Sequence, residues 1–222
     1  MIGTNKVDRD LWVYLLISSF DIIAVSLYPA ARVVSKPILM IVLALLFYGW
    51  TKQVSNPNRY LFLIALFFAW LGDVLLLADS MFLYGLGAFL IMQILYAVLF
   101  FRDQNYFGRR EVIYGIILFL VILIVLFAVG PSLGNLTIAF VIYTATIAIM
   151  SFSSFTRDFR YSGYWKVFYG ATLFMISDGT LAINQFAEPI PLGGIIVMVT
   201  YLTAQYLISF GYAAYLNEAL TK

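Results

Sequence analysis

The sequence predicts an all-α fold, a polytopic transmembrane bundle of about eight helices that forms one membrane domain over residues 1–222. The first observation is composition: 64% of the residues are hydrophobic and 11% are charged, whereas soluble domains are about 45–50% apolar and about 25% charged. The second is a series of apolar runs, each close to the roughly 20 residues that cross a bilayer as a helix. The third is that runs such as 112–129 lack the alternation typical of transmembrane strands.

Prolines, glycines and charged residues separate the apolar runs and mark turns between the predicted helices. These helices span about 11–29, 37–52, 59–78, 82–101, 111–130, 134–155, 165–187 and 192–216. The first follows a polar start without the apolar core and cleavage site of a signal peptide, so we expect an uncleaved anchor. The second begins at Pro37, which suits a first helical turn because the N–H that it lacks would be unpaired there. The third follows Asn56-Pro57-Asn58, and the fourth ends at the charged loop that starts with Arg102.

The last four predicted helices are bounded by signals of the same kind. The fifth begins after Arg109-Arg110 and ends at Gly130-Pro131, a break that also precedes the sixth. The sixth ends before the charged segment that contains Arg157. The seventh ends before Pro189–Pro191, and the eighth begins beside Gly193-Gly194.

The basic residues predict the orientation of the chain. With eight spans, eleven of the thirteen Lys and Arg residues fall on one side, and only Arg32 and Lys36 fall on the other. By the positive-inside rule, both termini are predicted to be cytoplasmic. We expect an integral membrane protein of the plasma membrane, which in a bacterium is the inner membrane.

The residue types that are missing exclude several chemistries. The chain has no His and no Cys, so it offers no imidazole base, no thiol nucleophile and no His or thiolate ligand for zinc. We therefore predict no metal and no cofactor. The formal charge of +2 comes from few and scattered residues, which argues against a nucleic-acid partner.

Three aspartates fall inside predicted helices, where ionisable side chains are costly and are functional candidates. Asp73 and Asp178 each lie about 13–14 residues, or roughly 20 Å at 1.5 Å per residue, past the start of a helix that runs outward. They are therefore expected at one depth in the outer half of the membrane, and they form the predicted catalytic pair. Asp21 is a further candidate.

Polar side chains of the inward-running helices fall at the same depth, which predicts a polar cavity open to the outer leaflet. Gln93, Tyr143 and Tyr201 lie about 9–11 residues below the outer surface. Lys36, at the outer entrance of the second helix, is the nearest cation and is expected to pair with an aspartate or a lipid phosphate. The predicted substrate-binding residues are Lys36, Gln93, Tyr96, Tyr143, Ser177, Asn184, Tyr201 and Gln205. The alternative role for each buried Gln, Asn or Tyr is an interhelical hydrogen bond.

Four segments resemble successive motifs of the YhhN family, which includes the animal lysoplasmalogenases of the TMEM86 type. They read WLGDVLLLADSMFLYGLGAFLIMQILY, VIYTATIAIMSFSSFTR, GATLFMISDGTLAINQF and MVTYLTAQYLIS. Ser35-Lys36-Pro37 stands where the family has a Lys-Pro pair, whereas Gln93 stands where the family often has His. The resemblance implies hydrolysis of the vinyl ether bond of lysoplasmalogens to a fatty aldehyde and a glycerophospho-headgroup. It makes a lysophospholipid and the lipid bilayer the expected partners.

Two carboxyl groups are sufficient for this reaction. One protonates carbon to give an oxocarbenium ion, and the other stabilises the positive charge and orients the water that captures it, as in glycoside hydrolysis. An aspartyl intramembrane protease also uses two membrane aspartates, but its YD, GxGD and PAL motifs are missing. The open alternative is a small transporter or lipid-binding protein whose aspartates bind protons or a cation.

Overall fold

The computed structural model describes residues 4–104 and 107–220, and the α-helical class is confirmed over these ranges, which contain no β-strand. The helices are α1 (Thr4–Leu27), α2 (Arg32–Trp50), α3 (Pro57–Leu75), α4 (Phe82–Arg102), α5 (Arg109–Leu133), α6 (Thr137–Thr156), α7 (Tyr164–Phe186) and α8 (Gly193–Glu218). Short 3-10 turns precede α2, α4 and α6, at Pro29–Ala31, Asp79–Met81 and Gly134–Leu136.

The helices carry the length and apolar surface of membrane spans. Among the described residues, five stretches are long and apolar enough to cross a bilayer: Pro29–Trp50, Pro57–Leu75, Asp79–Arg102, Arg109–Thr156 and Gly193–Glu218. Large apolar side chains are exposed along α5, where Ile124 is 67% and Phe127 is 88% accessible. A continuous apolar face of this kind fits contact with lipid rather than with water. The chain is therefore an integral membrane protein.

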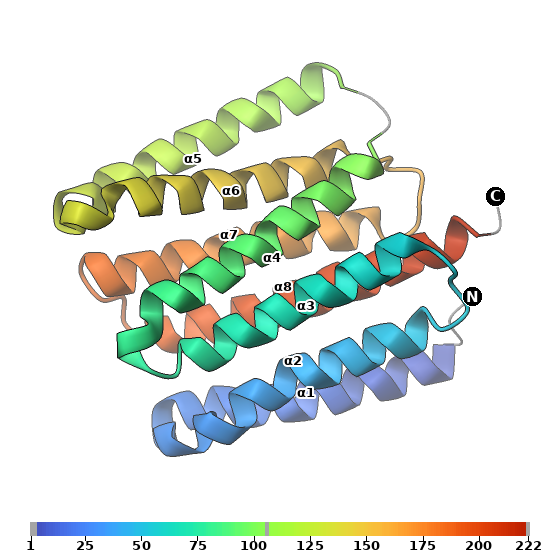
Figure 1. The fold of residues 1–222 in the computed structure, drawn as a ribbon, viewed down its shortest axis with the longest axis horizontal. Coiled ribbons are helices and arrows are strands. Elements are labelled where there is room, and N and C mark those ends of the chain that lie inside the picture. Colours follow the sequence, from blue (N-terminus) through green and yellow to red (C-terminus); the bar gives the residue numbers. More distant parts are fainter. Residues whose placement is uncertain (1–3, 105–106, 221–222) are drawn as a thin grey trace.

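The helices lie side by side along the long axis of the bundle, with α3, α4, α7 and α8 in the middle, α1 and α2 on one side, and α5 and α6 on the other (Figure 1). The first turns of α1 and the last turns of α8 lie at the same end. Trp50 links them, because its Nε1 donates to Asp10 Oδ2 at 2.9 Å and its carbonyl accepts from Asn217 Nδ2 at 3.0 Å. An even number of crossings is compatible with this arrangement.

The predicted start of the second helix is wrong. The structure begins α2 at Arg32 and places Pro37 inside the helix, and α5 likewise continues through Pro131 to Leu133. Proline is tolerated in membrane helices because neighbouring groups can satisfy the backbone carbonyl that it frees. The consequence is that Arg32 and Lys36 lie one turn apart on the same face of α2.

Helices α7 and α8 approach closely where two glycines meet. Gly163, at the start of α7, has a φ of 84°, and a Cβ built on it would lie 2.1 Å from the carbonyl oxygen of Gly211 in α8. Small residues permit such close approach between membrane helices. The contact therefore depends on the missing side chain and on the left-handed backbone.

We expect Gly163→Ala to lower the thermal stability of the detergent-solubilised protein. The strained backbone alone is expected to cost about 1–3 kcal/mol, and the clash with Gly211 adds to it. Gly130→Ala is the control, because a Cβ at Gly130 meets nothing within 4 Å. Equal melting temperatures for the two variants would contradict this account of the α7–α8 contact.

Candidate functional site

A cavity of about 430 Å³ lies between α2, α3, α4, α7 and α8. Six of the predicted site residues line it, namely Lys36, Asp73, Ser177, Asp178, Asn184 and Tyr201. Both predicted catalytic aspartates therefore face one space, although they are 105 positions apart in the sequence. The common depth that helix rise predicts for the two aspartates agrees with this arrangement.

Asp73 is buried and forms an ion pair with Lys36. Its side chain is 2% exposed, and its Oδ1 lies 3.4 Å from Nζ of Lys36. The hydroxyl of Tyr201 donates to its Oδ2 at 2.7 Å. Lys36 is itself buried in the body of α2, which corrects the expectation that it stands at an outer entrance. A paired carboxylate and ammonium at this depth make Asp73 suited to carry a negative charge.

Asp178 is held by neutral donors instead. Tyr143 on α6 and Gln93 on α4 both donate to its Oδ2, the amide of Gln93 at 3.4 Å. None of the ion pairs among the described residues involves Asp178. The two carboxyl groups of the cavity thus differ in their surroundings: one has a cationic partner and the other does not. Such a difference is what separates an acid from an anion in two-carboxylate sites.

Two of the other predicted residues line the cavity and bond to the backbone, and two more form a hydrogen-bonded pair outside the lining. Ser177 Oγ donates to the carbonyl of Val197 at 3.0 Å, and Asn184 Oδ1 accepts from the backbone N–H of Ile190 at 2.8 Å. These bonds tie α7 to α8 and to the loop between them. Two further hydrogen bonds involve predicted residues outside the cavity lining, Tyr96 Oη to Gln205 Oε1 at 3.0 Å and Gln205 Nε2 to Met92 Sδ at 3.2 Å.

Asp21 is not among the residues that line the cavity, but it contacts Arg32, a lining residue that was not predicted. Ser35 Oγ donates to Asp21 Oδ1 at 2.5 Å, and Nε of Arg32 lies 3.9 Å from the same oxygen. Arg32 lines the cavity beside Lys36 and keeps 24% of its side chain exposed. The sequence signal for Arg32 was its four-residue spacing from Lys36, which places both side chains on one face of a helix. That signal is informative only when α2 is known to begin before Pro37.

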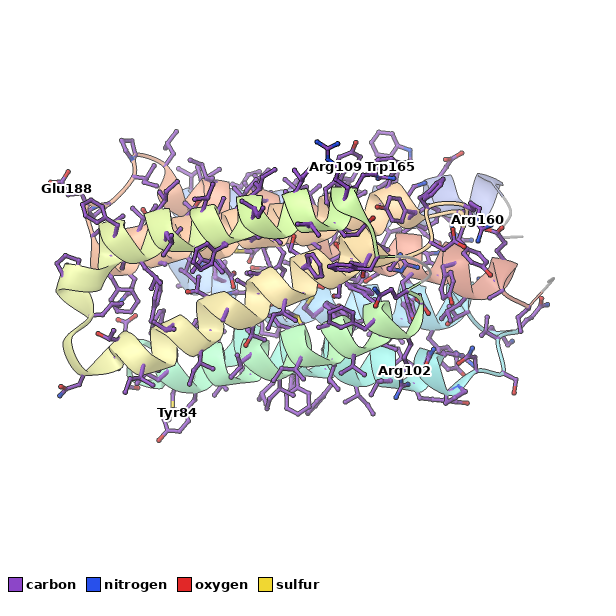
Figure 2. The ribbon with its side chains drawn as sticks, turned by 90° about the horizontal axis from the view of Figure 1, so that it is seen from above. Tyr84, Arg102, Arg109, Arg160, Trp165 and Glu188 are labelled. Carbon is purple, nitrogen blue, oxygen red and sulfur yellow. The ribbon has the colours of Figure 1, made fainter. Side chains whose placement is uncertain are left out.

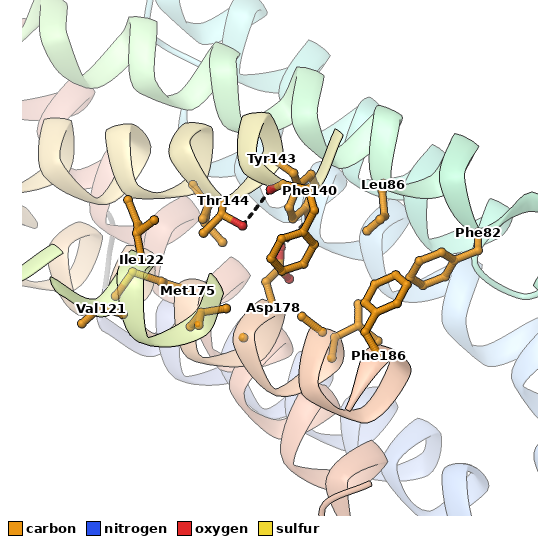
Figure 3. Close-up of a pocket in the computed structure, with 15 residues that line it drawn as sticks. Phe82, Leu86, Val121, Ile122, Phe140, Tyr143, Thr144, Met175, Asp178 and Phe186 are labelled. Atoms are coloured by element: carbon orange, nitrogen blue, oxygen red, sulfur yellow. Dashed lines mark hydrogen bonds between the residues drawn. The ribbon is translucent and has the colours of Figure 1, made fainter. Parts of the chain in front are cut away.

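One apolar pocket adjoins the polar cavity, and a second apolar space adjoins that pocket. The first, of about 60 Å³, is lined by side chains of α4, α5, α6 and α7 and includes Asp178 (Figure 3). The second, of about 290 Å³, is formed mainly by α4 and α6. Asp178 lines both the polar cavity and the smaller apolar pocket, whereas Tyr143 lines both apolar spaces. Sequence periodicity contains no signal for these spaces, because they depend on how helices are rotated against one another.

Comparison with known families identifies the family of the chain. The YhhN family profile matches residues 31–212. The chain belongs to the YhhN family. The matched range contains every described residue that lines the polar cavity and leaves out Asp21 and the rest of α1.

Two curated relatives of the YhhN chain carry the name "Lysoplasmalogenase TMEM86B". The protein of Sus scrofa is 35% identical over 142 residues, which cover 62% of this chain and 57% of the relative. The protein of Homo sapiens is 30% identical over 142 residues, with the same coverage of 62% and 57%. The chain thus spans a little over half the length of these relatives. No solved structure matches it.

Proposed function

We propose that this YhhN protein is a membrane-embedded hydrolase that cleaves the vinyl ether bond of lysoplasmalogens, such as lysoplasmenyl-ethanolamine or -choline. The observation that carries the proposal is the pair of buried aspartates that line one cavity in contrasting surroundings. The names of the two relatives support the same reaction. The products are a fatty aldehyde and a glycerophospho-headgroup.

In the proposed mechanism, Asp178 is the acid and Asp73 is the anion. Asp178 transfers its proton to the carbon next to the ether-bearing carbon, and the double bond becomes an oxocarbenium ion. Water adds to this ion and returns a proton to the site, and the resulting hemiacetal collapses to aldehyde and alcohol. Asp73, paired with Lys36 at 3.4 Å, stabilises the positive charge and orients the water. The net reaction consumes one water molecule and needs no other co-reactant.

The cationic wall of the cavity is the proposed site of the substrate phosphate. Lys36 is engaged by Asp73 at 3.4 Å, whereas Arg32 lies 3.9 Å from Asp21 and donates through Nη2 to the weak acceptor Met198 Sδ at 3.3 Å. A guanidinium group binds phosphate oxygens through two parallel hydrogen bonds. Arg32 is therefore the better placed of the two to meet the headgroup, with Lys36 beside it.

We further propose that α1–α8 all cross the bilayer and that both termini are cytoplasmic. Arg102 and Arg160 lie toward one end of the bundle and Glu188 and Tyr84 toward the other (Figure 2), a polarity that follows the positive-inside rule. Lys222, one of the eleven basic residues predicted on the cytoplasmic side, lies outside the described residues. Two reporters can be fused to the C-terminus, one that is active only in the cytoplasm and one that is active only outside it. The cytoplasmic reporter should be active and the other inactive. The opposite result, with a reporter inserted at Glu188 as control, would overturn this topology.

The decisive test of the reaction is a panel of three lipids offered to purified protein. Lysoplasmenyl-ethanolamine should release aldehyde, whereas its saturated alkyl-ether analogue should not, because it has no double bond to protonate. The ester-linked analogue should also be inert, since ester cleavage needs a nucleophile and oxyanion donors and the chain has no His or Cys. Ester hydrolysis at a comparable rate would overturn the two-aspartate mechanism. Failure with all three lipids, together with proton flux in reconstituted vesicles, would favour a transporter.

A further inference from the structure

Asp178 lines two spaces of different character, the polar cavity and the small apolar pocket. The larger cavity is lined by charged and amide side chains, among them Arg32, Asp79 and Asn184. The small pocket on the other side of Asp178 is lined by apolar side chains apart from Tyr143 and Thr144. Those two hydroxyl groups are already bonded, Tyr143 to Asp178 and Thr144 to the carbonyl of Phe140 at 2.8 Å. Apart from the Asp178 carboxyl, the small pocket therefore suits a hydrocarbon ligand.

The small pocket adjoins the apolar groove of about 290 Å³ between α4 and α6. Leu86, Phe140, Tyr143 and Phe186 line both spaces. Farther along, the groove is bordered by Leu83 and Ile142, which are 50% and 52% exposed. In a membrane protein, an exposed apolar rim of this kind faces acyl chains. A chain entering between α4 and α6 therefore meets apolar side chains and the already bonded hydroxyl groups of Tyr143 and Thr144 before Asp178.

We propose that the hydrocarbon chain of the substrate enters between α4 and α6, lies in this groove and in the small pocket, and ends with its reactive double bond at Asp178. The inference rests on the proposed function and adds to it the direction of the bound lipid. The small pocket has room only for the first carbons of the chain, and the groove of about 290 Å³ takes the carbons that follow. The headgroup then falls in the polar cavity, on the side of Arg32 and Asp73.

This direction explains why Asp178 rather than Asp73 donates the proton. The carbon to be protonated belongs to the chain and not to the glycerol, so it lies on the apolar side of the ether bond. Asp178 borders that side as well as the polar cavity, whereas Asp73 lines the polar cavity. The water that captures the oxocarbenium ion can reach it from the polar cavity. The reverse direction would place a hydrocarbon against Arg32, Asp79 and Asn184.

The chain offers a matched pair of glycines for testing this route. A Cβ on Gly87, in the groove, would meet nothing within 4 Å, and the same is true of Gly130 on α5. Gly130 is absent from the lining of both apolar spaces and of the polar cavity. A leucine therefore adds the same bulk at two positions where a Cβ has room, but only Gly87→Leu places that bulk in the groove.

The first measurement is kcat/KM for vinyl-ether lysolipids of increasing chain length. Gly87→Leu should lower kcat/KM about tenfold or more for long chains, a loss of about 1.4 kcal/mol or more, and should leave short chains nearly unaffected. Normal turnover of short chains would also show that the variant is folded. Gly130→Leu should follow the unmodified protein at every length. An equal loss at all lengths, or no loss, would overturn the inference while leaving the proposed reaction intact.

A second measurement does not depend on turnover. A saturated alkyl-ether lysolipid with a photoreactive diazirine at the end of its chain should crosslink to the segments of α4 and α6 around Gly87 and Ala139. Gly87→Leu should reduce this labelling several-fold, and Gly130→Leu should not. Labelling confined to the loop around Ile190, beside the polar cavity, would show that the chain points the other way. If this labelling is as expected but no lipid is cleaved, the binding route stands and the proposed reaction fails.

Discussion

Asp178→Asn should abolish release of aldehyde from lysoplasmenyl-ethanolamine, with turnover reduced about 100-fold or more, the usual range for loss of a general acid. Asparagine keeps the volume of the side chain and an oxygen that can accept from Tyr143, but it has no acidic proton to give to carbon. Asp73→Asn should cause a loss of similar size, because a neutral amide cannot stabilise an oxocarbenium ion. Both are measured as aldehyde formed per unit of purified, monodisperse protein.

A third substitution separates chemistry from folding. Asp10 is also a buried carboxylate, which accepts from Trp50 Nε1 at 2.9 Å, but it is not among the residues that line the cavity. Asp10→Asn should therefore keep turnover near that of the unmodified protein. Asp178→Glu should recover part of the activity that Asp178→Asn loses, since it restores a proton donor. Near-normal turnover in Asp73→Asn or Asp178→Asn would remove that aspartate from the mechanism.

Helix rise predicted that several polar residues of different helices come together, and the structure contains the contacts. Asp73 bonds to Tyr201, and Asp178 bonds to Tyr143 and Gln93, as expected for residues at similar distances from their helix ends. The constant rise of 1.5 Å per residue makes such estimates reliable even when helix boundaries shift by a few residues. The class of fold and the approximate helix positions were predictable because they depend on composition and on local apolar runs of about 20 residues.

Rotation of each helix about its own axis was not predictable. Tyr96 and Gln205 lie near the level of the aspartates, yet they turn toward each other at 3.0 Å and away from the cavity. The sequence also left two positions open for Lys36, one paired with an aspartate and one exposed at the start of a helix. That distinction depended on α2 beginning before Pro37, against a strong local signal for a helix start at that proline.

The largest effect on stability is expected from Lys36→Met. Lys36 and Asp73 are buried together, with side-chain exposures of 8% and 2%. Removal of one partner leaves an uncompensated charge in a medium that solvates it poorly, which typically costs about 3–5 kcal/mol. We therefore expect a large fall in the melting temperature of the detergent-solubilised protein, accompanied by loss of turnover.

The double variant Lys36→Met/Asp73→Asn shows whether the pair or the individual side chains are responsible. With both charges removed, the desolvation penalty disappears, and replacement of a buried ion pair by neutral groups is often close to neutral for stability. Its melting temperature should therefore return most of the way to that of the unmodified protein, giving a strong coupling energy in the double-mutant cycle. Turnover should stay as low as in Asp73→Asn, because the anion is still missing. A double variant that is no more stable than Lys36→Met alone would show that Lys36 contributes through its packing in α2 and not through the charge of Asp73.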